Sequence, residues 1–95
     1  MPVVISPAAQ RDLESIGDYI AADNPSRAVA FIRKIRNRCE VLDATPLAAP
    51  LRNDIGPGIR MIVQDRYLIF YSLNDESVRI ERILHASRNI ASLFE

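Results

Sequence analysis

The sequence predicts a two-layer α+β fold, in which a hairpin of two antiparallel helices packs on one face of a mostly antiparallel sheet. Two strand-like segments, 67–72 and 78–84, flank the polar turn 73–77, as in an antiparallel hairpin. Two segments with apolar residues at helical spacing precede them, and a short apolar strand, 3–5, comes first. The expected order is strand, helix, helix, three strands and a short C-terminal helix, in a single domain spanning 1–95.

Each predicted helix begins with a capping residue followed by a proline. Ser6 and Asn24 are the expected N-caps, and Pro7 and Pro25 suit the first helical positions. Because only a short turn separates the two helices, they should form an antiparallel hairpin. Each helix carries one apolar stripe, formed by Ala9, Leu13, Ile16 and Ile20 in the first and by Ala28, Phe31, Ile32, Ile35, Cys39 and Leu42 in the second.

The first strand of the predicted β-hairpin is apolar on both faces. Tyr67, Ile69 and Tyr71 point to one face, and Leu68 and Phe70 point to the other. A strand of this kind lies in the middle of a sheet and is covered on both sides. Two helices cover only one face, so we expect a partner chain to cover most of the second.

The remaining segments complete the sheet and leave one long connection. Residues 44–58 contain three prolines and two glycines, and a loop of this length is a place to look for function. The segment 59–63 then resumes a strand. Ser87 is the expected cap of the terminal helix, whose apolar residues are Ile90, Leu93 and Phe94.

Arg82 is a charge within an otherwise apolar strand. On strict alternation it shares its face with Val78, Ile80 and Leu84. Three interpretations stay open: the side chain snorkels to solvent, pairs with a carboxylate, or faces a partner.

Composition excludes several classes of protein. The chain has 12 Lys and Arg against 12 Asp and Glu, which argues against general polyanion binding, although local basic patches remain compatible with it. Its single cysteine forms no internal disulfide, and no cysteine pair or histidine cluster indicates a metal site. No apolar run approaches the length of a membrane span, and no leader-like segment precedes Ser6, so we expect a cytoplasmic protein.

Several fragments of the chain are similar to those of one known family. They are Ser6-Pro7-Ala8-Ala9, Asp12-Leu13, Asp18-Tyr19-Ile20, Asn24-Pro25, Ile55-Gly56-Pro57-Gly58-Ile59-Arg60, Arg66-Tyr67-Leu68-Ile69-Phe70-Tyr71 and Arg82-Ile83-Leu84-His85-Ala86-Ser87-Arg88. Together they resemble the ParE branch of the RelE/ParE superfamily, the toxins of bacterial type II toxin–antitoxin pairs. The likeness spans nearly the whole chain in the right order, whereas any one fragment alone would be weak evidence.

The resemblance implies a toxin that inhibits DNA gyrase without catalysing a reaction and without a cofactor or metal. It also implies that a co-expressed, ParD-like antitoxin holds the toxin inactive in a hetero-oligomer. Because antitoxins of this superfamily fold along their toxins, the resemblance indicates two groups of surface residues. The antitoxin-binding candidates are Tyr67, Ile69, Tyr71, Arg33 and Arg36, and the candidates for contact with the target are Arg60, His85 and Arg88.

The alternative within the same superfamily is a RelE-type ribonuclease that cuts messenger RNA on the ribosome. Such an enzyme needs acid–base groups and cations around the scissile phosphate. The candidates would be Arg60, Arg66, Arg82 and His85, although a lone histidine at a strand end is more often a structural group. Zero net charge and a single lysine favour the gyrase hypothesis, since phosphate contacts dominate ribosome binding. A third hypothesis is a toxin fold that binds antitoxin but is no longer toxic.

Overall fold

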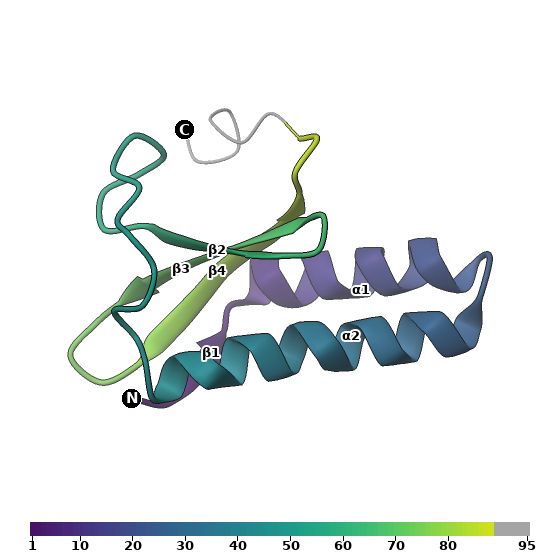
Figure 1. Cartoon of the computed structure of the whole chain (residues 1–95), viewed down its shortest axis with the longest axis horizontal. Coiled ribbons are helices and arrows are strands. Elements are labelled where there is room, and N and C mark those ends of the chain that lie inside the picture. The colour runs from purple at the N-terminus through teal and green to yellow at the C-terminus, as the bar shows by residue number, and fades with distance from the viewer. Residues whose placement is uncertain (89–95) are drawn as a thin grey trace.

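The computed structural model describes residues 1–88 and confirms the predicted α+β fold (Figure 1). The elements are β1 (Val3–Ile5), α1 (Pro7–Ala21), α2 (Pro25–Glu40), the 3₁₀ turn η1 (Val41–Asp43), β2 (Arg60–Gln64), β3 (Tyr67–Leu73) and β4 (Val78–His85). The sheet has the order β1-β4-β3-β2, with β1 parallel to β4 and the other neighbours antiparallel. The predicted terminal helix carrying Ile90, Leu93 and Phe94 lies outside the described residues.

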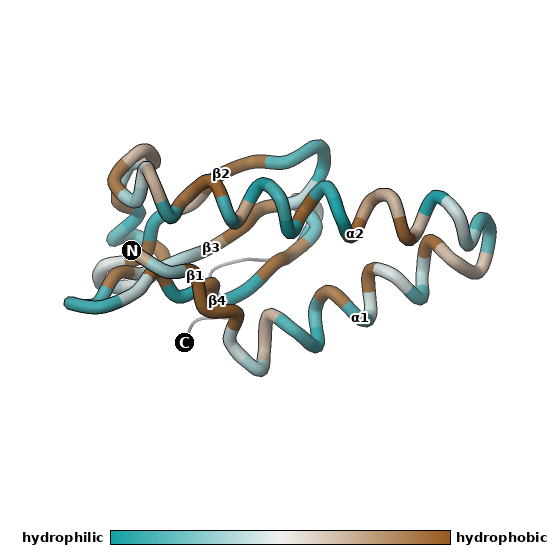
Figure 2. Tube along the Cα trace, turned by 90° about the horizontal axis from the view of Figure 1, so that it is seen from below, coloured by the Kyte–Doolittle hydropathy of each residue, from teal (hydrophilic) through white to brown (hydrophobic). Residues whose placement is uncertain are grey.

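Both predicted helix starts are confirmed by hydrogen bonds. The Ser6 hydroxyl accepts from the Ala9 amide at 3.0 Å, and the Asn24 side chain accepts from the Arg27 amide at 3.1 Å. Along α1 and α2, hydrophobic and hydrophilic stretches alternate at helical spacing (Figure 2). The two helices lie side by side beneath one face of the sheet, and their far ends project beyond it (Figure 1).

The main core lies between the helical hairpin and the sheet. Leu13 of α1 and Ile35 of α2 pack with Ile69 and Tyr71 of β3 and Ile83 of β4. All five side chains are at most 2 % exposed. Burying side chains of this size stabilises the fold by roughly 1.5–3 kcal/mol each, so this layer is what holds the hairpin on the sheet.

A β-bulge in β4 changes which side chains share a face. Phe70 pairs with Arg82, but the next residue, Tyr71, pairs with Ile80, so Glu81 is an extra residue. Ile80 therefore faces the helices, whereas Arg82 lies on the second face opposite Phe70. The predicted alternation, which placed Arg82 with Val78 and Ile80, is wrong because it did not include the bulge.

The second face of the sheet is better covered than expected. Phe70 is 0 % exposed and Leu84 is 3 % exposed, and both pack with Ile59 and Ile55 from the long loop. The expectation that a partner chain must cover these two side chains is therefore wrong, because burial within the chain already removes them from water. Val63 of β2 remains 57 % exposed on this face.

Candidate functional site

An open groove of about 1490 Å³ lies where the hairpin projects beyond the sheet. One wall is formed by the C-terminal half of α1 and the N-terminal half of α2, and the other by the β2–β3 turn and the end of β4. The lining residues are Ser15, Ile16, Tyr19, Ile20, Ala22, Asp23, Arg27, Ala30, Phe31, Lys34, Asp65, Arg66, Tyr67, His85, Ser87 and Arg88.

The ring of Tyr67 joins the two walls of the groove through contacts with the rings of Phe31 and His85. The Phe31 and Tyr67 rings are 5.3 Å apart between centroids, and Tyr67 meets His85 edge to face at 5.2 Å. Burial, and to a smaller extent the nearby Tyr19, raises the pKa of Tyr67 above its usual value. The Tyr67 phenol therefore stays neutral at physiological pH, and its ring packs against Phe31 and His85.

His85 is oriented by the turn that follows β4. Its Nδ1 accepts a hydrogen bond from the Ser87 backbone amide at 3.1 Å and lies 2.8 Å from the Ser87 hydroxyl. Because a backbone N–H can only donate, Nδ1 is the acceptor in this contact, which leaves Nε2 as the ring nitrogen free to meet a partner in the groove. The same turn is tied to the β2–β3 turn, since the Ala86 amide donates to the Arg66 carbonyl at 2.9 Å.

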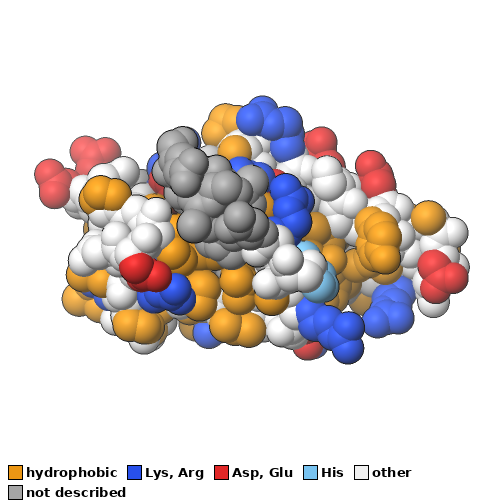
Figure 3. All heavy atoms as spheres, turned by 90° about the horizontal axis from the view of Figure 1, so that it is seen from above, with side chains coloured by type: hydrophobic (Ala, Val, Ile, Leu, Met, Phe, Trp, Pro, Cys, Tyr) orange, Lys and Arg blue, Asp and Glu red, His pale blue; other side chains and the backbone are white. Residues whose placement is uncertain are grey.

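Cationic side chains surround these rings. Arg66 and Arg88 lie on the two joined turns, are exposed, and form no ion pair with residues 1–88. Lys34 also lines the groove, but its ammonium group is paired with Asp65 at 3.1 Å. Seen from above the sheet, blue cationic and orange apolar side chains lie around the histidine (Figure 3).

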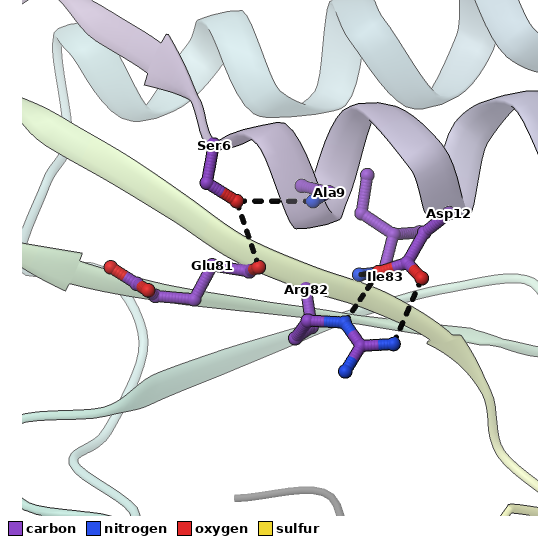
Figure 4. Close-up of polar contacts among 6 residues, drawn as sticks. All are labelled: Ser6, Ala9, Asp12, Glu81, Arg82 and Ile83. Carbon is purple, nitrogen blue, oxygen red and sulfur yellow. Dashed lines mark hydrogen bonds and ion pairs between the residues drawn. The ribbon is translucent and has the colours of Figure 1, made fainter.

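Arg82 and Arg60 are both engaged in structural contacts away from the groove. The Arg82 guanidinium donates to both carboxylate oxygens of Asp12, at 2.8 and 3.0 Å (Figure 4). Of the three interpretations of Arg82, the structure therefore selects pairing with a carboxylate. The Arg60 guanidinium donates to the Ala49 carbonyl in the long loop.

Residues 1–88 contain no cluster of three or more histidine, cysteine or acidic side chains that would hold a metal ion. Within the same residues, no helix is both long and apolar enough to cross a membrane. The lone thiol, Cys39, is buried in the core and forms no disulfide with any described residue.

Comparison with known proteins decides the family. The sequence model described as "ParE toxin of type II toxin-antitoxin system, parDE" matches residues 3–90. The chain belongs to the ParE toxin family. No curated protein sequence matches the chain.

Two solved structures similar to this ParE family member are toxin–antitoxin complexes. The first is the chromosomal ParDE system of P. aeruginosa, with 20 % sequence identity, a TM-score of 0.78, and coverage of 90 % of this chain and 95 % of that one. The second is the RelBE2 complex of Mycobacterium tuberculosis, with 25 % identity, a TM-score of 0.65, and coverage of 88 % and 95 %. Both likenesses extend over most of this chain.

The four residues considered for a ribonuclease do not converge in this ParE family member. Arg66 and His85 line the groove, but Arg60 pairs with Tyr71 at the opposite end of the sheet. Tyr67 and Tyr71, which mark the two ends, are four positions apart along β3, a span of about 13 Å at roughly 3.3 Å per residue. Because Arg82 is also held by its ion pair, no single phosphate would meet all four side chains.

The residues predicted to bind an antitoxin are likewise separated. Tyr67 lies in the groove, whereas Arg33 and Arg36 are exposed on α2 outside it. Ile69 and Tyr71 are 0 % exposed because the helices cover them, and they offer no surface to a partner. The prediction that these two residues bind the antitoxin is therefore wrong. The prediction assigned this face of β3 to the antitoxin, but it is the face that the helices cover.

Sequence reasoning missed several residues of the groove. Ile16, Ile20 and Phe31 were predicted as parts of the helix stripes and not as site residues, although they line the groove where the hairpin extends past the sheet. Tyr19 was not singled out, yet it is 80 % exposed at the groove. A large aromatic residue outside the stripe was the available signal, since such side chains are enriched at interfaces.

Proposed function

We propose that this chain is a toxin that inhibits DNA gyrase and is neutralised by a cognate, ParD-like antitoxin in a hetero-oligomeric complex. The observation that carries the proposal is the match of the ParE family model over residues 3–90. The two similar solved structures, both toxin–antitoxin complexes, support the antitoxin partner. Gyrase acts on chromosomal DNA, so the proposal places the protein in the cytoplasm.

The separation of the candidate catalytic residues favours gyrase inhibition over messenger RNA cleavage. Arg60 anchors a loop, Arg82 is paired with Asp12, and neither faces His85 across a common site. Acid–base catalysis requires both groups within hydrogen-bonding reach of one substrate. Of the target-contact candidates, His85 and Arg88 lie together in the groove and remain in the proposal, whereas Arg60 lies apart from them.

Expression of the chain alone in bacteria tests this function. We expect growth arrest with double-strand DNA breaks, and rescue when the antitoxin is expressed with it. In vitro, the purified toxin should inhibit supercoiling by gyrase, and added antitoxin should restore it. Codon-positioned cuts in messenger RNA that disappear in His85→Ala or Arg60→Ala would establish the ribonuclease instead. Normal growth with intact antitoxin binding would indicate a toxin fold without toxicity.

A further inference from the structure

We propose that the outer face of the helical hairpin, which is turned away from the sheet, binds a second copy of this chain (Figure 1). The proposal goes beyond the proposed function and does not depend on it. It follows from the order of the charges along α1 and α2, because the charges on one helix are complementary to those on the other.

Each helix carries one strip of charged residues on this face. The α1 strip and the α2 strip consist, respectively, of Arg11, Glu14 and Asp18, and of Arg33, Arg36 and Glu40. Spacings of three and four residues place the members of each strip on one side of their helix. All six residues are exposed, and none forms an ion pair with any residue in 1–88.

Like charges are neighbours within each strip. Glu14 and Asp18 are four residues apart on α1, and like charges at this spacing repel each other weakly. Arg33 and Arg36 are three residues apart on α2, with the same consequence. This grouping does not stabilise the isolated helices, but it presents two negative and two positive charges, side by side, to a partner of opposite charge.

Contacts between the two helices show which residues lie at the same level. The Arg36 guanidinium donates to the Gln10 side chain at 3.3 Å, and a Cβ added at Gly17 would lie 3.5 Å from the Ile32 side chain. The helices run antiparallel (Figure 1). The α1 strip therefore starts at the level where the α2 strip ends, and in this direction α1 reads positive, negative, negative, whereas α2 reads negative, positive, positive.

A twofold axis parallel to the helices would bring the two strips together. Rotation about this axis stacks α1 of one copy on α2 of the other, and the stacked helices are antiparallel. The expected ion pairs between the copies, each formed twice by symmetry, are Arg11 with Glu40, Glu14 with Arg36, and Asp18 with Arg33. They need an offset along the helices of about one turn, roughly 5 Å, which the crossing angle of packed helices and the length of the arginine side chains supply.

Other occupants of this face fit the charges less well. A twofold axis perpendicular to the helices would stack α1 on α1, so that Glu14 and Asp18 would face the same carboxylates of the second copy. A nucleic acid would be attracted by Arg33 and Arg36, but the acidic residues of the neighbouring α1 strip would repel its phosphates. A second copy in the parallel-axis arrangement matches both strips at once.

The size of the face predicts a weak dimer. Helices of 15 and 16 residues, each about 10 Å wide, present at most about 450 Å² on each copy. The total of about 900 Å² is below the roughly 1,200–2,000 Å² of stable interfaces. Val29, which is 60 % exposed one turn from Arg33, and the groove of about 460 Å³ between the helices add apolar contact. We therefore expect a monomer and a dimer in exchange, with more dimer at higher concentration.

Sedimentation velocity of the purified chain over a range of concentrations tests the proposal. We expect Glu14→Arg/Asp18→Arg, and separately Arg33→Glu/Arg36→Glu, to weaken self-association by about tenfold or more, because like charges then face each other. An equimolar mixture of the two variants should restore association, since the reversed α1 strip of one meets the reversed α2 strip of the other. Wild-type association should also weaken in 1 M salt, where the screening length falls to about 3 Å.

The matched control is Asp75→Arg/Glu76→Arg. It makes the same change of charge as the α1 variant, but in the exposed turn between β3 and β4, outside both strips. Self-association of this control should stay within about threefold of the wild type. Circular dichroism confirms that each variant is folded, which is expected because every substituted residue is exposed.

Three results would overturn the proposal. The first is a wild-type chain that stays monomeric at the highest concentration, and the second is a dimer that neither strip variant weakens. The third is a mixture of the two folded variants that does not associate. A monomeric wild type, together with weaker binding of the full-length antitoxin to Arg33→Glu/Arg36→Glu, would assign this face to the antitoxin instead. Inhibition of gyrase supercoiling is measured separately, so failure of the dimer leaves the proposed function standing.

Discussion

The carboxylate of Asp12 on α1 holds Arg82 of β4 although 70 positions separate them in the chain. The same carboxylate also accepts the backbone N–H of Ile83 at 2.9 Å. β1 pairs with β4 only as far as Ile80, so the edge of β4 would be open beyond that point. Asp12 thus closes this edge and fixes α1 on the sheet, as the close-up shows (Figure 4).

We predict that Asp12→Ala lowers the free energy of unfolding by about 2–3 kcal/mol. The substitution leaves a half-buried guanidinium and a strand N–H without their acceptor. Urea denaturation measures the change, and Lys34→Ala is the control, because its ion pair with Asp65 is exposed and is worth at most about 1 kcal/mol. Equal effects of the two substitutions would show that the Asp12 contacts are no stronger than a surface pair.

We predict that Ser6→Ala costs about twice as much stability as Asn24→Ala. Both side chains cap a helix, which is worth about 1 kcal/mol. The buried Ser6 hydroxyl also donates to the Glu81 carbonyl at the bulge, at 2.9 Å, so its loss leaves a second group unsatisfied. Thermal melts of the two variants test the ratio, and a similar shift in melting temperature for both would contradict it.

Cys39 should make stability fall at high pH. Burial raises the pKa of the Cys39 thiol from 9.0 to about 11 in the folded protein. The folded state favours the neutral thiol, so the contribution of Cys39 to the free energy of unfolding is complete below pH 9. This contribution decreases as the thiol of the unfolded chain ionises and is lost by about pH 11. Urea titrations across this range, compared with Cys39→Ala, isolate the contribution, which should be missing in the variant.

The same burial should protect the thiol from reagents. We expect 5,5′-dithiobis(2-nitrobenzoate) at pH 8 to react with Cys39 only as fast as the chain unfolds, since both exposure and thiolate are lacking in the fold. Rapid reaction that does not depend on added urea would contradict this.

We predict that Tyr71→Phe loosens the long loop without disrupting the core. The Tyr71 hydroxyl donates to the Pro46 carbonyl at 3.0 Å, and its loss should cost about 1 kcal/mol. The Arg52 amide, bonded to the Ile59 carbonyl at 2.6 Å, is the reporter, and its hydrogen exchange should become faster. Arg60→Ala should act in the same way by releasing the Ala49 carbonyl, while amides in α2 keep their wild-type exchange.

The helices and the β-hairpin could be predicted because their signals are local. Ser6-Pro7 and Asn24-Pro25 place a cap and a proline next to each other, and the stripe of α2 repeats at helical spacing. The boundaries of β3 and β4 each differ from the prediction by one residue. Neighbouring residues are sufficient to specify such elements, whatever packs on them later.

The bulge at Glu81 and the groove could not be predicted in this way. No residue type in β4 indicates that the strand contains a bulge. Strict alternation therefore assigned Arg82 to the wrong face. The groove exists because the helical hairpin extends beyond the ends of the strands, which places Phe31 beside Tyr67 and leaves Tyr67 in contact with His85. The lengths of the helices and strands and their relative placement decide whether the groove forms. Their relative placement follows from the packing of the core.

The amino-acid sequence by itself determined the order of elements, the helix starts, the apolar stripes and the resemblance to ParE toxins. Each of these depends on residues that lie close together in the chain. Only the tertiary structure decided that Ile69 and Tyr71 are core, that Asp12 holds Arg82, and that Tyr67 and His85 share a groove. These relationships join segments far apart in sequence, and the chain forms them only when burial of its apolar faces brings those segments together.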